Sequence, residues 1–103
     1  MRRFSLAVLV GLLAIGAAQA QPKGDPAEGR RIAERWCAGC HVVSPNQTSA
    51  SADVLTFKAI AKKAGDHPES LEAFLADPHP VMVDISLTQR EIRDLVAYIA
   101  SLR

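Results

Sequence analysis

The chain has 103 residues, of which 49% are hydrophobic and only 5% are aromatic. This length allows one compact domain and excludes two. The 12 basic and 11 acidic side chains give a formal net charge of +1. This nearly equal balance argues against a protein that binds nucleic acid through a basic surface.

The first 20 residues have the three parts of a secretory signal: two arginines, an apolar run, and small residues in Ala18-Gln19-Ala20. We expect cleavage after Ala20, which exports residues 21–103 as the mature domain. The apolar run of about 15 residues is shorter than the roughly 20 that a membrane-spanning helix needs. A retained anchor is therefore the weaker alternative.

The first helix of the mature chain is expected to begin at Asp25. This residue is a suitable N-cap, Pro26 suits the first helical position, and Glu28 completes the D-x-x-E form of a capping box. Apolar or small residues then recur at helical spacing as far as Trp36 and Cys37. The helix is therefore expected to carry Cys37 on its buried face.

Residues 42–56 are polar and are expected to form a loop around whatever the cysteines hold. A short helix is predicted from Phe57 to Ala64, ended by Gly65. Its lysines, at 58, 62 and 63, form a solvated face that could also dock an acidic partner. Another short helix is predicted from Pro68 to the stop at Asp77-Pro78, with an apolar stripe at residues 71, 74 and 75.

Residues 78–86 are expected to form a second irregular segment, because two prolines, Pro78 and Pro80, come shortly before Met82. The last helix has the clearest signal in the chain. Thr88 and Glu91 form a T-x-x-E capping box, and apolar residues then repeat at helical spacing up to Leu102. Because no segment alternates convincingly like a strand, the predicted fold class is all-α, with four short helices and connecting loops.

Two cysteines and a histidine form the motif C-x-x-C-H at Cys37, Cys40 and His41. In this arrangement the thiols can add to the two vinyl groups of a haem while the adjacent imidazole reaches the iron. A zinc site would need four nitrogen or sulfur ligands, and His67 and His79 are isolated in the sequence. A dithiol oxidoreductase would need a sheet, for which there is no signal. We interpret the motif as the anchor of one covalent haem c.

The sixth iron position decides what such a protein does. Met82 is the only methionine of the mature chain, and its proline-flanked loop lies far enough along the chain to return to the opposite haem face. We favour Met82 as an iron ligand over the alternative of core packing. His79 is the rival ligand, which would give a lower reduction potential.

Three segments together resemble the class I c-type cytochromes of bacteria: EGRRIAERWCAGCH, PHPVM and LTQREIRDLVAYIASL. The resemblance covers essentially all of the mature sequence. It implies a small cytochrome c fold in residues 21–103 around one haem, with thioethers to Cys37 and Cys40. His41 would be the proximal iron ligand and Met82 the distal one.

The resemblance also places a crossing of the first and last helices at Gly29 and Tyr98. Two positions depart from the family pattern. Val83 follows the methionine where many relatives have proline, and Ala33 stands where the first helix usually has an aromatic residue.

A His/Met pair leaves no open iron position, so the resemblance implies a soluble periplasmic electron carrier and not an enzyme. Its partners would be redox proteins, namely a dehydrogenase, a respiratory complex or a terminal acceptor. Nucleic acid is not expected, and a membrane is expected only through a partner or an uncleaved signal. One alternative is a haem subunit of a larger dehydrogenase or respiratory complex. Another is a haem sensor or peroxidase with a labile Met82, which Val83 favours.

Overall fold

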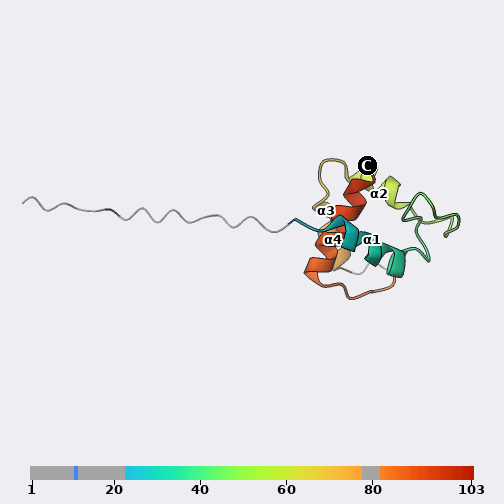
Figure 1. The fold of residues 1–103 in the computed structure, drawn as a ribbon, viewed down its shortest axis with the longest axis horizontal. Helices are drawn as coiled ribbons and strands as arrows, with labels where there is room; N and C mark the ends of the chain where they lie inside the picture. The colour runs from blue at the N-terminus through green and yellow to red at the C-terminus, as the bar shows by residue number, and fades with distance from the viewer. Residues whose placement is uncertain (1–10, 12–22, 78–81) are drawn as a thin grey trace, which may run out of the picture.

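The computed structural model describes Gly11, residues 23–77 and residues 82–103. It contains the helix α1 (Pro26–Ile32), a π-helical turn η1 (Ala33–Cys37), and the helices α2 (Phe57–Ala64), α3 (Ser70–Ala76) and α4 (Gln89–Ser101). Strands are absent from these residues, so the all-α prediction with four helices is confirmed (Figure 1). None of the helices described is long and apolar enough to cross a membrane. Apart from Gly11, the expected signal segment 1–20 lies outside the described residues.

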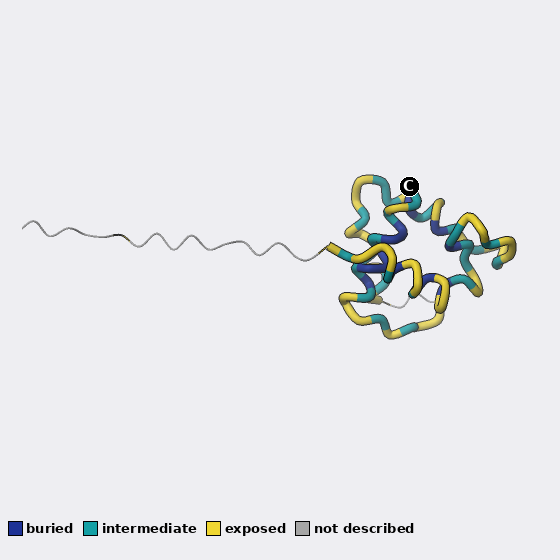
Figure 2. Tube along the Cα trace, viewed as in Figure 1, coloured by how far each residue is buried: buried dark blue, intermediate teal, exposed yellow. Residues whose placement is uncertain are grey.

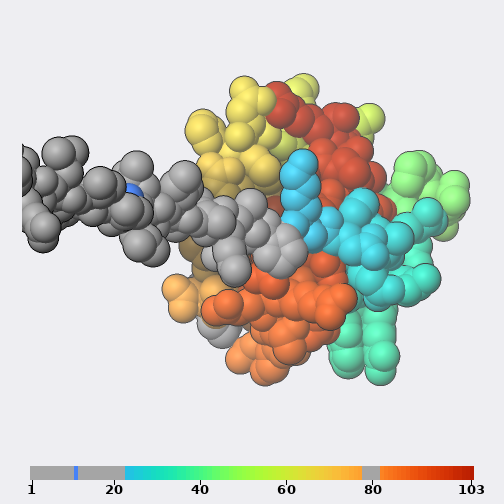
Figure 3. Space-filling view, turned by 60° about the vertical axis from the view of Figure 1, so that its left-hand side comes forward, coloured from blue at the N-terminus to red at the C-terminus, as the bar shows by residue number. Residues whose placement is uncertain are grey.

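Helices α1 and α4 touch through their backbones. A Cβ atom added to Gly29 would lie 1.9 Å from the carbonyl oxygen of Asp94 and 2.8 Å from Cβ of Tyr98. No side chain fits at position 29, which allows the two helices to approach closely. Figure 3 shows the start of α1, in cyan, lying directly against α4, in orange to red. The crossing that the resemblance places at Gly29 and Tyr98 is confirmed.

The start of α1 differs in one contact from the prediction. Asp25 is the N-cap, and its carboxylate accepts a hydrogen bond from the backbone N–H of Ala27 at 2.9 Å. The predicted capping box is wrong. The backbone N–H of Asp25 donates to Oδ1 of Asp94 at 2.8 Å, while Glu28 forms an ion pair with Arg31. A carboxylate of α4 therefore takes the role that the sequence assigned to Glu28.

The predicted capping box at the start of α4 is confirmed. The N–H of Glu91 donates to the hydroxyl of Thr88, and the N–H of Thr88 donates to the carboxylate of Glu91, each at 3.1 Å. These two hydrogen bonds satisfy donors that a helix start otherwise leaves unpaired.

Helix α3 begins at Ser70 and not at Pro68, because residues 67–69 form a turn with the hydrogen bond from Ser70 N to the His67 carbonyl (3.1 Å). The stripe predicted on α3 is only partly buried. Leu71 and Leu75 pack against the core, whereas Phe74 is 55% exposed.

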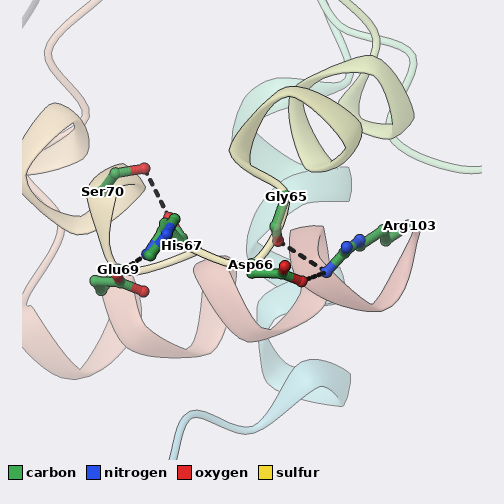
Figure 4. A network of polar contacts seen from close by, with 6 residues as sticks. All are labelled: Gly65, Asp66, His67, Glu69, Ser70 and Arg103. Carbon is green, nitrogen blue, oxygen red and sulfur yellow. Dashed lines mark hydrogen bonds and ion pairs between the residues drawn. The ribbon is translucent and has the colours of Figure 1, made fainter.

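The end of the chain is tied to the turn between α2 and α3. The guanidinium of Arg103 donates to the carbonyl of Gly65 at 3.0 Å and to the carboxylate of Asp66 at 2.7 Å (Figure 4). In the same turn, Nδ1 of His67 lies 3.0 Å from the Glu69 carboxylate. The C-terminal residue thus links α4 to the turn that follows α2.

The core lies between η1, α2, α4 and the start of the loop after the cysteines. Figure 2 shows the buried stretches towards the middle of the domain and the exposed residues on the outer turns. The main cluster consists of Ala33, Cys37, Val43, Phe57, Ala61, Leu95, Tyr98 and Ile99.

Candidate functional site

The turn η1 delivers the first cysteine of the motif to the core. The backbone N–H of Ala38 donates to the carbonyl of Ala33 at 3.0 Å, a bond that spans five residues and makes the turn wider than an α-helical one. Cys37 is buried and Cys40 is exposed, and both are free thiols. Burial raises the pKa of the Cys37 thiol to about 11, because it disfavours the thiolate.

The same wide turn carries Trp36. This residue is expected to pack beside the cofactor, which stays a prediction; within the protein itself it is 52% exposed. The wide turn keeps Ala33 and Cys37 in the core and rotates Trp36 away from it. The guanidinium of Arg35 lies 4.9 Å from the centroid of the tryptophan ring, within the range of a cation–π contact.

The imidazole of His41 is held from two sides. Its Nδ1 lies 2.6 Å from the carbonyl oxygen of Leu55, and its ring centroid lies 5.4 Å from that of Phe57 with an interplanar angle of 50°. A carbonyl oxygen can only accept a hydrogen bond, so Nδ1 carries the proton in the neutral ring. The lone pair of Nε2 is consequently available to a metal, the arrangement in which a ligating histidine is oriented by a second hydrogen bond.

The backbone after Cys37 is held just as firmly. The N–H of His41 donates to the Cys37 carbonyl at 2.9 Å, which closes the turn between the two cysteines and the histidine. Four consecutive carbonyls, those of residues 40–43, each accept a hydrogen bond from the loop or the helices around the motif. In that order the donors are Ser51 N, Gln47 Nε2, Phe57 N and the Tyr98 hydroxyl.

Met82 and Cys37 lie on the same hollow in the surface. Its wall combines these two residues with apolar side chains that include Leu75, Leu87 and Leu95. The hollow thus brings together the first cysteine and the expected distal ligand, which are far apart in the sequence. Cys40 and His41 do not belong to its described lining. The rival ligand His79 lies outside the described residues.

These residues fit a covalently held haem. The turn presents two free thiols beside an imidazole whose tautomer leaves Nε2 open, and a methionine lines the same apolar hollow as the first cysteine. Imidazole, thioether and thiol groups are the side chains that c-type haem sites use. An apolar wall suits a largely apolar macrocycle.

Gln47 is the polar side chain that does most to hold the motif, and the sequence did not predict this role. It did not predict the contact of His41 with the Leu55 carbonyl either. The carbonyl has no sequence signal, because every residue has one. For Gln47 the available signal was weak, namely a long amide side chain within the loop after the histidine.

The all-helical fold and the C-x-x-C-H turn define a class, and the comparison with known proteins agrees: the chain belongs to the c-type cytochromes and carries covalent haem c. It is 47% identical over 79 residues to cytochrome c-552 of Bradyrhizobium diazoefficiens. The match covers 77% of this chain and 76% of that relative. No protein-family model matches the chain, and no solved structure matches it either.

Proposed function

We propose that the protein is a periplasmic electron carrier whose one haem c is attached to Cys37 and Cys40, with His41 and Met82 as the axial iron ligands. One observation carries the proposal: Cys37 and Met82 line the same apolar hollow. The haem-attachment site and the expected distal ligand therefore share one wall of the domain.

The residues of this site have distinct tasks. When bound, the haem iron supplies a one-electron couple. The Leu55 carbonyl orients the His41 ring and keeps the proton on Nδ1, which leaves Nε2 to bind iron. Met82 brings a thioether, which favours the reduced state more than a second imidazole does. With both axial positions taken by side chains, the site has no position for substrate, and a carrier role follows.

The proposed location rests on the N-terminal segment, and the proposed partners on the charge of the surface. Cleavage after Ala20 would release residues 21–103 to the periplasm. A dehydrogenase, a respiratory complex or a terminal acceptor would exchange electrons with it there. The exposed lysines of α2, at 58, 62 and 63, support a partner with an acidic surface, whose association rate should fall as ionic strength rises.

The test is the optical spectrum of the haem-loaded protein in the ferric state. We expect the weak far-red band of a methionine–iron bond, its loss in Met82→Ala, and its retention in the neighbouring control Val83→Ala. If the unmutated protein lacks this band, the assignment of Met82 is wrong. A protein that matures without covalent haem contradicts the whole proposal.

A second candidate function, a haem sensor or peroxidase with a labile Met82, is supported by one observation. Val83 is 78% exposed and stands where relatives often have proline, so little packing restrains the residue next to the methionine. Binding of carbon monoxide to the reduced protein at neutral pH would favour this candidate. Failure to bind would favour the carrier.

A further inference from the structure

The side chain of Gln47 makes four hydrogen bonds to the backbone around the haem-binding motif. Its Nε2 donates to the carbonyls of Ala38 at 2.8 Å, His41 at 2.7 Å and Ser49 at 3.0 Å. Its Oε1 accepts from the backbone N–H of Val43 at 2.9 Å. One side chain from the loop thus bonds to a residue between the two cysteines, to the histidine itself and to the chain just after it.

This pattern requires an amide. The carbonyls of Ala38 and His41 each need a donor, while the N–H of Val43 needs an acceptor, and only the asparagine and glutamine side chains offer two donor hydrogens and an acceptor in one planar group without charge. The two hydrogens on Nε2 are shared among three carbonyls, so the donating capacity of the side chain is fully used. Gln47 is half-buried, and its hydrogen bonds to Ala38, His41 and Val43 are partly buried, which makes these three costly to lose.

We propose that Gln47 is a positioning residue for the haem-binding turn. By fixing the carbonyls of Ala38 and His41 it sets the backbone of the turn, and through the backbone it sets the plane of the His41 imidazole. The ring is held independently by Leu55 and Phe57, so both the backbone and the imidazole of the histidine are held in position. The inference rests on the proposed role of His41 as the proximal iron ligand.

Two substitutions separate the hydrogen bonds from size and charge. Gln47→Leu has a similar size and no charge and removes all four hydrogen bonds. Gln47→Glu keeps an oxygen for Val43 and loses both donors, and it places a carboxylate against three carbonyls. Because that negative charge alone lowers the reduction potential, the neutral variant decides the question. Gln47→Asn retains the amide on a shorter stem and is expected to have a smaller effect, which keeps the test open if the larger changes prevent maturation.

Two control variants make comparable changes outside the haem-binding turn. Gln89→Leu makes the same replacement at an exposed position, the first residue of α4. Thr88→Ala removes the N-cap of α4, far from the motif in the sequence, and lowers the stability of the fold. Because its neighbour Leu87 lines the hollow, it shows what a local loss of stability near the site does while the hydrogen bonds of Gln47 stay in place.

The measurement is the set of haem-methyl resonances in the proton NMR spectrum of the ferric holoprotein, together with the reduction potential. The spread of these resonances depends on the plane of the axial imidazole. We expect Gln47→Leu to shift them well beyond the differences among the unmutated protein, Gln89→Leu and Thr88→Ala, and to change the potential. Unchanged resonances in the Gln47 variants, or an equal change in Thr88→Ala, overturn the proposal.

Failure of the underlying function looks different. If the unmutated ferric protein is not low-spin and six-coordinate, the assignment of the axial pair fails, whatever the Gln47 variants do. If it is, and the Gln47 variants match the controls, only the positioning role fails.

Discussion

The imidazole Nδ1 of His41 lies 2.6 Å from the carbonyl oxygen of Leu55, 14 positions further along the chain. The position of this carbonyl is set by the start of α2, which follows at once. Thr56 caps the helix by accepting a hydrogen bond from Ala59 N at 3.1 Å, and the N–H of Phe57 donates to a carbonyl in the loop at 2.9 Å. The orientation of the histidine thus depends on a helix cap.

Thr56→Ala should therefore destabilise helix α2 and weaken the contact between the Leu55 carbonyl and the His41 ring. Loss of an N-cap side chain costs about 1 kcal/mol, which denaturant unfolding of the holoprotein should show as a lower midpoint with an unchanged slope. Thr56→Ser retains the hydroxyl and is the matched control. Equal stability of the alanine and serine variants would contradict the role of the cap.

Gly29→Ala should be far more damaging. The added Cβ would lie 1.9 Å from the carbonyl oxygen of Asp94, and backbone cannot move aside as a flexible side chain can. Helices α1 and α4 would have to separate, at a cost of about 3 kcal/mol or more. Thermal unfolding of the holoprotein measures the loss.

The control for this prediction is Gly39→Ala, because a Cβ at Gly39 meets no other protein side chain or backbone within 4 Å. We expect this variant to be close to the unmutated protein in stability. A tolerated alanine at position 29 would mean that the two helices do not approach as closely as described.

The parts of the fold that could be predicted from sequence are those fixed by neighbours along the chain. The Thr88 and Glu91 cap, the stop at Gly65 and the C-x-x-C-H motif all depend on short spacings, and each was found. The capping box at Asp25 was wrong because its acceptor comes from Asp94, at a sequence separation of 69 residues.

The missed parts of the site depend on groups that leave little trace in a sequence. The acceptor for His41 is a backbone carbonyl, which has no residue signature. The partners of Gln47 are backbone groups too, so the residue type alone did not reveal its role. Helical spacing assumes an α-helix, so it did not predict that the chain widens to a π turn at Ala33–Cys37.

Arg103→Ala should have only a small effect, although Arg103 joins two elements. Its ion pair with Asp66 is exposed on both sides, and such pairs contribute no more than about 1 kcal/mol. A double-mutant cycle with Asp66→Ala isolates the pair. The coupling should shrink further at high salt, and a large coupling that is insensitive to salt would contradict this prediction.

Tyr98 gives the molecule a specific response to alkaline pH. Its side chain is 6% exposed, and its hydroxyl donates to the carbonyl of Val43. Burial raises the pKa of this phenol, Arg30 lowers it to a lesser extent, and Glu34 raises it again. The folded state thus favours the protonated phenol more than the unfolded chain does.

The direction of the pH dependence of stability follows from the linkage between protonation and folding. A group whose pKa is raised on folding contributes stability that is fully present below its unfolded pKa of about 10 and is lost as the pH rises through the folded pKa. Tyr98→Phe should cost about 1–3 kcal/mol at pH 7, because the buried carbonyl of Val43 loses its donor. The difference in stability between the two proteins should narrow above about pH 10. There the phenol of the unfolded unmutated chain ionises and favours unfolding, whereas the Phe variant has no such group.

Two measurements check this prediction. Urea unfolding of both holoproteins from neutral to alkaline pH gives the difference in stability, and titrations shared by the two proteins cancel in it. The tyrosinate absorbance reports the phenol directly, because Tyr98 is the only tyrosine in the chain. We expect its midpoint in the folded protein to lie above the ordinary value, since ionisation there must break the hydrogen bond to Val43 and place a charge in the core. A midpoint at or below that value, or a difference in stability that widens with pH, would show that the hydroxyl is not held in the core as described.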